Sequence, residues 1–588
     1  MSALANPMLR LRFPIWRSRF LLVVLVGWLV GLAGRAVYLQ GLNNDFLQQK
    51  GESRYSRVVE IGAHRGRITD RNGEPLAIST AVESVWASPG DFNPNSDQLR
   101  RLGRLLASDP ADMARRLGDT KREFVYLRRQ LPPEQAAKVV ELNIPGVFLQ
   151  REYRRFYPAG EVVSHLVGMT DIDDKGQEGL ELAYQEVLVG KAGSRRVIKD
   201  RLGRIIEDVE SIRAPQQGRD LTLSIDLRLQ YLAYRELKAA LEEHRAKAGG
   251  LVILDARTGE VLAMANLPTY NPNNRGRIDP QRSRNRALVD LFEPGSTLKP
   301  FAVAASLEAG RITPETIIHT GPGRMTIGKA TINDVHAAGS ITVEQVIQKS
   351  SNVGAAKIAL ELSPQTMWGL YSRSGFGAVP KSGFPGEGSG RLRAYNTWKP
   401  IEQATMSYGH GISVSLLQLA RAYTIFAGDG ELLPVTLIKP SQPVVGSPAI
   451  TPRTAKAIRK MLEMAVQPGG TAPRAQVAGY RVAGKTGTAH KLENGRYAQS
   501  KYVSSFVGFA PVSDPRIVVA VMIDEPSAGQ HYGGAVAAPV FSQVVQAALR
   551  TLSVAPDAPT MNVKLPPADA PVIREEVWIA RDDPGHKG

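Results

Sequence analysis

The pattern that most constrains the fold is a pair of strand groups separated by a long, largely helical stretch within residues 219–555. The apolar runs with strand character fall into two groups: 250–255 and 260–264, then 480–489, 502–511 and 516–524. Amphipathic helices are predicted beside them, over 227–246, with Asp226 as its N-cap, and over 535–553. The most economical arrangement is a five-stranded antiparallel sheet, built from both ends of the segment, with a helical lobe inserted. We therefore predict an α+β domain over 219–555, with a site in the cleft between sheet edge and helical lobe.

The N-terminal region has the pattern of a membrane segment. Residues 1–19 carry four arginines and no acid, and Phe20 to Gly34 carry no charge. With Arg35 reaching the interface, this run predicts a transmembrane anchor over 20–42. The competing interpretation is a cleaved signal peptide with Gly34-Arg35-Ala36 as its cleavage site. Positive charge before the span predicts a cytoplasmic tail over 1–19 and places the rest of the chain outside the cytoplasm.

Two further segments differ in character from the rest. Residues 43–218 are predicted to form a second, mixed N-terminal domain. Its dense charges are expected on solvated faces and in salt bridges, and it shows no nucleophile with a base and an orienting group. Residues 556–588 are rich in proline and alanine and are predicted to be a flexible C-terminal tail.

The composition excludes several kinds of function. The formal charge of +17 is spread over the whole length, without zinc-ligand spacing, a phosphate loop or a long basic block, so nucleic acid is not the expected partner. A diffuse positive charge suits an anionic neighbourhood, such as a membrane surface or an acidic polymer. The chain has no cysteine, which excludes disulfides and thiolate chemistry, and its nine histidines show no metal spacing. We therefore expect no metal and no cofactor.

Three short motifs in the predicted domain follow one another in order: Ser296-x-x-Lys299, Ser350-x-Asn352 and Lys485-Thr486-Gly487. At a helix start, the Lys299 amine can reach the Ser296 hydroxyl three residues away. Pro300 disfavours a helix interior here, so Ser296 is predicted in or just before the first turn. Each motif alone is common in proteins. The ordered trio is the signature of penicillin-binding proteins and class A β-lactamases.

From about residue 43 to 553 the chain resembles a class B penicillin-binding protein, close to the division-specific, FtsI-type transpeptidases of Gram-negative bacteria. Besides the trio, the resemblance rests on five stretches: Arg65–Gly73, Arg155–Glu161, Arg284–Ala287 leading to Glu293–Ser296, Tyr408–Val414 and Phe506–Pro511. It implies a penicillin-binding, serine β-lactamase-like fold for the transpeptidase domain and a pedestal domain of the dimerisation type over 43–218. It also places the catalytic domain in the periplasm on a single inner-membrane span.

The resemblance also implies a role for each motif residue. Ser296 would be the nucleophile and Lys299 its base, with a pKa that burial near Lys485 depresses. Ser350 would relay protons, and the backbone N–H groups of Ser296 and Thr488 would form the oxyanion hole. The remaining residues would bind substrate, the amide of the stem peptide or its terminal carboxylate: Asn352, Lys485, Thr486, Gly487 and Thr488.

The implied reaction is peptidoglycan cross-linking at the septum, through an acyl-enzyme on Ser296 that releases the terminal D-alanine. The implied partners are peptidoglycan stem peptides, covalently bound β-lactams, the membrane, and division proteins that include a polytopic glycan polymerase. No Glu-x-x-x-Asn motif lies between Asn352 and Lys485, although Glu361 and Glu402 are acidic candidates, so slow hydrolysis of the acyl-enzyme is expected. The alternatives are an elongation-type or auxiliary paralogue, a D,D-carboxypeptidase or β-lactamase, and a non-catalytic β-lactam sensor. His410 is expected to line the cleft, with a structural role or an effect on specificity.

Overall fold

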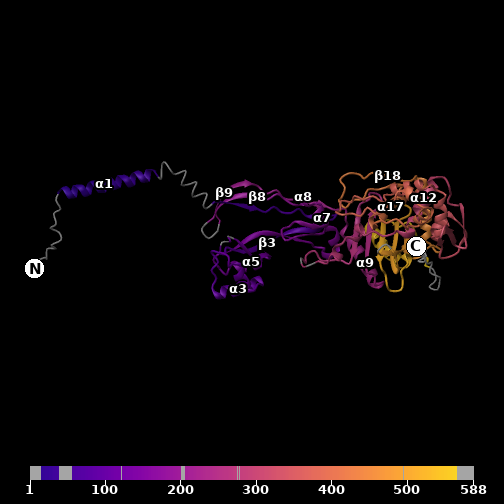
Figure 1. The fold of residues 1–588 in the computed structure, drawn as a ribbon, viewed down its shortest axis with the longest axis horizontal. Helices are drawn as coiled ribbons and strands as arrows, with labels where there is room; N and C mark the ends of the chain where they lie inside the picture. Colours follow the sequence, from indigo (N-terminus) through magenta and orange to yellow (C-terminus); the bar gives the residue numbers. More distant parts are fainter. Residues whose placement is uncertain are drawn as a thin grey trace, which may run out of the picture. The chain divides into compact units, whose positions relative to one another are not determined.

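The computed structural model describes residues 15–38, 56–120, 122, 124–199, 205–274, 276, 278–493 and 496–565 (Figure 1). The contacts within the chain divide it into two compact units. The first unit comprises Met1–Ala63, Val82–Glu152 and Gly190–Gln217, and the second comprises His64–Ala81, Tyr153–Val189 and Gly218–Gly588. Each unit is described by itself.

The second unit contains the predicted five-stranded sheet. Its strands are β11 (Ala248–Asp255), β12 (Val261–Leu267), β19 (Ala483–Glu493), β20 (Arg496–Ala510) and β21 (Ile517–Asp524). Their order is β12-β11-β21-β20-β19, and every neighbouring pair is antiparallel. The sheet is thus built from both ends of the segment, as predicted. β19, which carries Lys485 to Thr488, is an edge strand.

Two helices from the ends of this segment cover one face of the sheet. α9 (Leu227–Glu243) begins at the predicted N-cap, because Asp226 accepts a hydrogen bond from the Arg228 N–H. α20 (Ala538–Thr551) packs against α9. Buried apolar side chains from both helices and the strands form this core: Leu229, Leu237, Leu251, Ile253, Phe506, Val519, Phe541 and Val545. Val252, Leu254 and Val507, which alternate with these strand residues, pack into the core of the helical lobe.

The inserted lobe lies between β12 and β19 in the sequence. Its helices are α10 (Pro280–Ser283), α11 (Arg286–Val289), α12 (Lys299–Glu308), α13 (Val343–Gln348), α14 (Asn352–Leu360), α15 (Pro364–Arg373), α16 (Pro400–Met406), α17 (Leu416–Ala427) and α18 (Pro452–Val466), with 3-10 turns η4 (Gly295–Leu298), η5 (Tyr395–Thr397) and η6 (Pro473–Ala475). Its short strands form three pairs: β13 (Ile317–Gly321) with β16 (Gly339–Thr342), β14 (Arg324–Ile327) with β15 (Ala330–Asn333), and β17 (Glu431–Leu432) with β18 (Ser447–Pro448). α19 (Gly533–Val536) follows β21.

The upstream segments of the second unit enclose a buried ion cluster. Their elements are β2 (Ile68–Thr69), the start of β3 (Pro75–Ala87), the end of β5 (Val147–Phe156), η3 (Gly160–Val162), α6 (Ser164–Val167), β6 (Met169–Thr170), β7 (Gly176–Glu178), α7 (Gly179–Ala183), α8 (Gln185–Leu188) and β10 (Leu221–Thr222). Glu181 accepts from Arg65 and Arg155, both at 2.7 Å, and all three side chains are almost fully buried. The expectation of solvated faces is therefore wrong for these residues, whereas that of salt bridges is confirmed.

The first unit holds the remaining elements. They are α1 (Ile15–Val37), β1 (Ser56–Ile61), α3 (Ser96–Leu106), α4 (Pro110–Arg116), β4 (Val125–Leu131), α5 (Pro133–Val140), β8 (Gly193–Lys199) and β9 (Ile205–Arg213), with the end of β3 and the start of β5. β1, β8 and β9 form an antiparallel sheet, and residues 83–87 of β3 pair with β4. Among the described residues, α1 is the one helix long and apolar enough to cross a membrane. It begins five residues before the predicted span, while residues 39–42 lie outside the described part.

The first residues after the domain are held against it. Asn562 donates from Nδ2 to the carbonyls of Val477, at 3.1 Å, and Tyr480, at 2.9 Å. Asp557 accepts from the Arg481 N–H at 2.7 Å. This part of the predicted flexible tail is therefore fixed by hydrogen bonds, whereas residues 566–588 lie outside the described residues.

Candidate active site

Ser296 lies in a 3-10 turn that leads directly into a helix. The turn η4 covers Gly295–Leu298, and α12 begins at Lys299. Pro300 falls in the first turn of α12, where its missing N–H leaves no hydrogen bond unmade. The predicted position of Ser296 at the start of its helix is therefore confirmed, and Pro300 fits the helix.

Lys299 lies between the two serines of the motifs. Its Nζ donates to Ser296 Oγ at 3.0 Å, to Ser350 Oγ at 2.9 Å and to the Ser350 carbonyl at 2.5 Å. The lysine is fully buried and Ser296 is 3% exposed. Because the amine is within hydrogen-bond reach of both hydroxyls, it can receive a proton from one and pass it to the other.

Ser350 has a backbone conformation that is rare for its residue type. Its φ is +58°, in the left-handed region, which costs a residue with a Cβ on the order of 1–2 kcal/mol. Both its carbonyl and its hydroxyl meet Lys299. Such strain persists only where the surroundings impose it, and it is frequent at functional sites.

Asn352 begins helix α14 and is held by a residue that the sequence analysis did not identify. Asp334 accepts from the backbone N–H groups of Asn352, at 2.5 Å, and Val353, at 3.0 Å, and from Ser351 Oγ at 2.6 Å. Asn352 Nδ2 donates to the Asn333 carbonyl at 3.0 Å. A carboxylate at a helix N-terminus satisfies free N–H groups and stabilises the helix dipole. The end of strand β15 thus positions the second motif.

Lys485 is fully buried on the edge strand β19. Its Nζ donates to Thr486 Oγ1 at 3.0 Å and to Thr471 Oγ1 at 3.4 Å, and the two threonine hydroxyls are 2.9 Å apart. Thr471 belongs to the segment after α18 and was not predicted. One ammonium surrounded by hydroxyl groups provides charge and hydrogen-bond donors suited to a carboxylate.

The edge strand approaches the turn that carries Ser296 closely. A Cβ on Gly295, whose φ is +57°, would lie 3.3 Å from the Thr488 carbonyl oxygen, and one on Gly487 would lie 2.7 Å from the Pro294 carbonyl oxygen. On the other side, the Gly533 N–H donates to Thr488 Oγ1 at 3.0 Å. The structure therefore brings the first and third motifs together, and the loop with Gly533, to which sequence assigned no task, supports the strand.

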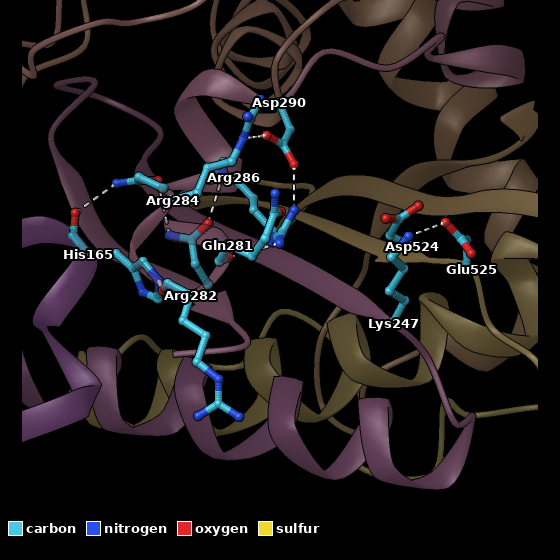
Figure 2. A network of polar contacts seen from close by, with 12 residues as sticks. His165, Lys247, Gln281, Arg282, Arg284, Arg286, Asp290, Asp524 and Glu525 are labelled. Atoms are coloured by element: carbon cyan, nitrogen blue, oxygen red, sulfur yellow. Dashed lines mark hydrogen bonds and ion pairs between the residues drawn. The ribbon is translucent and has the colours of Figure 1, made fainter. Parts of the chain in front are cut away.

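The stretch before Ser296 is fixed by a polar network (Figure 2). His165 Nε2 lies 2.7 Å from the Arg282 carbonyl, and the Asp290 carboxylate pairs with both Arg284 and Arg286. Burial lowers the pKa of His165 to about 4, so its ring is neutral at pH 7.

Among the described residues, no group of three or more potential ligands could hold a metal ion.

Comparison with known families identifies the class of protein that this fold and site define. Residues 249–546 match the family model described as the penicillin binding protein transpeptidase domain. Residues 60–223 match the model described as the penicillin-binding protein dimerisation domain. The chain belongs to the class B penicillin-binding proteins, as the resemblance predicted, and the predicted fold class and enzyme class are confirmed.

Individual relatives cover almost the whole chain. It is 43% identical over 548 residues to the probable peptidoglycan D,D-transpeptidase PenA of Neisseria meningitidis, which covers 92% of this chain and 94% of that protein. It is 41% identical over 560 residues to the peptidoglycan D,D-transpeptidase FtsI of Escherichia coli, covering 94% of each. Among solved structures it is similar to the apo transpeptidase domain of Burkholderia pseudomallei penicillin-binding protein 3, with 51% identity and a TM-score of 0.54 over 57% of this chain and 98% of that one.

Proposed function

We propose that the chain cross-links peptidoglycan stem peptides as a D,D-transpeptidase that forms an acyl-enzyme on Ser296. The observation that carries the proposal is the buried Lys299 amine, bonded to Ser296 Oγ at 3.0 Å and to Ser350 Oγ at 2.9 Å. The names of the relatives, peptidoglycan D,D-transpeptidases over most of the chain, support the same reaction.

Acylation begins with a proton transfer inside this cluster. Neutral Lys299 takes the Ser296 proton while Oγ attacks the carbonyl carbon between the two terminal D-alanines. The N–H groups of Ser296 and Thr488 are assigned to the resulting oxyanion, where losing one donor costs about 3–4 kcal/mol. The C–N bond then breaks, and the departing D-alanine amine takes the proton from Lys299 through the Ser350 hydroxyl.

Substrate recognition is assigned to the remaining motif residues. Lys485, with the hydroxyls of Thr486 and Thr488, takes the terminal carboxylate of the stem peptide, or the carboxylate of a β-lactam. Gly487 keeps the strand free of a side chain where it meets Pro294. Asn352 takes the stem-peptide amide. Thr471 joins this set because its hydroxyl lies within reach of Lys485 Nζ.

The acyl-enzyme is proposed to react with an amine and to hydrolyse slowly. The amine of a second stem peptide attacks the ester carbonyl, Lys299 takes its proton, and Ser296 Oγ leaves with a proton. Glu402 is a poor base for activating water, because its carboxylate accepts from the Lys399 N–H and from Arg393, both at 2.8 Å. Burial alone would raise the pKa of Glu402, but these bonds hold it below its usual value. The other candidate, Glu361, is exposed at the end of α14.

We further propose that α1 anchors the chain in the bacterial inner membrane, with the N-terminus in the cytoplasm and the catalytic domain in the periplasm. The apolar helix and the four arginines among residues 1–19 support this orientation. The FtsI relatives support a role in septal synthesis. We propose division proteins, among them a polytopic glycan polymerase, as its partners. A paralogue with the same chemistry is the second candidate, because relatives named PenA and PbpC match over 548 and 542 residues, against 560 for FtsI of Escherichia coli.

The proposal is tested with fluorescent penicillin and the detergent-solubilised full chain beside Ser296→Ala. We expect stable labelling of the wild type only; an unlabelled wild type refutes the catalytic role, and rapid loss of label indicates a β-lactamase. Incubation with a stem-peptide thioester and a D-amino acid acceptor separates transfer from hydrolysis. Hydrolysis alone would contradict the transferase assignment.

A further inference from the structure

Glu293, three residues before the nucleophile, accepts hydrogen bonds from three separate groups. Its carboxylate receives the Gly411 N–H at 2.9 Å, the Tyr497 hydroxyl at 3.0 Å from each oxygen, and His410 Nδ1 at 2.9 Å. Its side chain is 12% exposed. A carboxylate with this many donors around it is ordered by its surroundings and orders them in turn.

The donors come from the segments that surround Ser296. Tyr497 lies on β20 opposite Leu492 of β19, in the hairpin that carries the Lys-Thr-Gly motif. His410 and Gly411 follow Gly409, whose carbonyl accepts from the Gly295 N–H at 3.4 Å. A Cβ on Gly409 would lie 2.2 Å from the Gly295 carbonyl oxygen, so this segment packs directly on the nucleophile turn. Glu293 therefore joins the nucleophile turn, the 408–411 segment and the β19–β20 hairpin.

The charge of Glu293 is matched to this role. Burial would raise its pKa, but the hydrogen bonds from His410, Gly411 and Tyr497 outweigh it and hold the pKa below its usual value. An ionised carboxylate is an acceptor only, which suits a position where every neighbour donates. A glutamine has nearly the same shape, but its NH₂ group would face donors and leave at least one of them unpaired.

His410 adds an unsatisfied group to this cluster. It is 7% exposed, and its Nε2 has no hydrogen-bond partner among the residues that the structure describes. The hydrogen bond from Nδ1 to the Glu293 carboxylate fixes the orientation of the ring. The rings of Tyr408 and Tyr497 flank it at centroid distances of 5.6 and 6.1 Å. The imidazole is thus oriented by Glu293 and packed by two tyrosines.

We propose that Glu293 is a positioning residue for acylation, acting through His410, Gly411 and Tyr497 to hold the hairpin and the 408–411 segment in register with Ser296. The inference rests on the proposed function of the site. Glu293 touches no reacting atom in it. Its loss shifts the three segments relative to one another, and a misplacement near 1 Å costs roughly 10²-fold in rate.

The test compares Glu293→Gln with Tyr497→Phe and the double variant in the full-length protein in detergent. Penicillin acylation is followed over a concentration series, which separates the acylation rate constant from the binding constant, at several pH values between 5 and 9. We expect Glu293→Gln to lower the rate constant by roughly 10²-fold, at a nearly unchanged binding constant, with a smaller loss for Tyr497→Phe. The double variant should lose no more than Glu293→Gln, because both remove one network.

Controls separate positioning from misfolding and from failure of the catalytic assignment. Glu243→Gln, at an exposed glutamate in α9, should behave as wild type. Glu293→Asp, which restores the charge on a shorter side chain, should recover part of the rate. The inference is overturned if Glu293→Gln acylates at the wild-type rate, or if titration shows only fewer active molecules with an unchanged rate constant. An unlabelled wild type would instead refute the proposed function itself.

Discussion

Two substitutions of Ser350 separate its hydroxyl from its backbone conformation. Ser350→Ala and Ser350→Gly both remove the Oγ that lies 2.9 Å from Lys299 Nζ. Both retain the backbone carbonyl, 2.5 Å from the same nitrogen, so Lys299 keeps this hydrogen bond. They differ in the φ of +58°, which alanine adopts with strain and glycine without it.

The two effects have different expected sizes. If Ser350 relays protons, both variants lose about 10²–10⁴-fold in acylation rate, the usual contribution of a proton-transfer group. In stability they should diverge, because relief of left-handed strain favours glycine over alanine by about 1 kcal/mol. The glycine variant also loses more chain entropy on folding, which reduces that difference by a few tenths up to about 1 kcal/mol. The glycine variant should therefore be as stable as the alanine variant or more stable.

Acylation rates with fluorescent penicillin and denaturant unfolding curves check both expectations. Ser350→Thr, which keeps a hydroxyl but adds a branched Cβ at a positive φ, serves as the third variant. It should retain more activity than alanine and be the least stable of the three. If Ser350→Ala is acylated at the wild-type rate, the proton relay through Ser350 is refuted. If Ser350→Gly is clearly less stable than Ser350→Ala, the backbone strain at residue 350 is refuted.

Three further predictions concern stability and positioning. The pKa of His165 is about 4 in the folded chain and 6.5 ordinarily, so the unfolded chain binds the proton at a higher pH than the folded chain does. The free energy of unfolding should therefore be full above about pH 6.5 and fall by up to about 3 kcal/mol as the pH is lowered to 4. In unfolding curves, His165→Gln should reduce this dependence on pH. Asp334→Ala should lower the free energy of unfolding by about 1–2 kcal/mol and slow acylation, because the first N–H groups of α14 lose their acceptor. Wild-type stability together with a wild-type acylation rate would contradict the capping role of Asp334. Gly533→Ala places a Cβ 2.4 Å from the Ser505 carbonyl oxygen. It should destabilise the folded protein by about 1–3 kcal/mol and reduce labelling by fluorescent penicillin. An unchanged melting temperature would exclude the clash.

Much of the fold follows from local patterns. Continuous apolar runs and the Asp226 cap predicted the sheet and α9, since strands buried on both faces are apolar along their whole length. Pro300 predicted that Ser296 precedes its helix, because proline tolerates only the first turn. The trio of motifs predicted which side chains to examine together.

The supporting residues could not be predicted in the same way. Asp334, Thr471 and Glu293 act on partners far away in the sequence, and no periodicity encodes which turn meets which strand. The buried Glu181 with its two arginines was mistaken for solvated charge, because burial of a charge is decided by neighbours that only the fold supplies. The positive φ of Ser350 likewise has no signature in a serine.

The central claim is that Ser296 carries the acyl group of the substrate. The direct measurement is mass spectrometry of the full-length protein, quenched during turnover of a stem peptide ending in D-alanyl-D-alanine and then digested. We predict one acyl group on the peptide that contains Ser296, one D-alanine released for each acylation event, so that the released D-alanine at least equals the acyl groups on the protein, and none of either with Ser296→Ala. An acyl group on another residue, or D-alanine release by Ser296→Ala at the wild-type rate, would contradict the account.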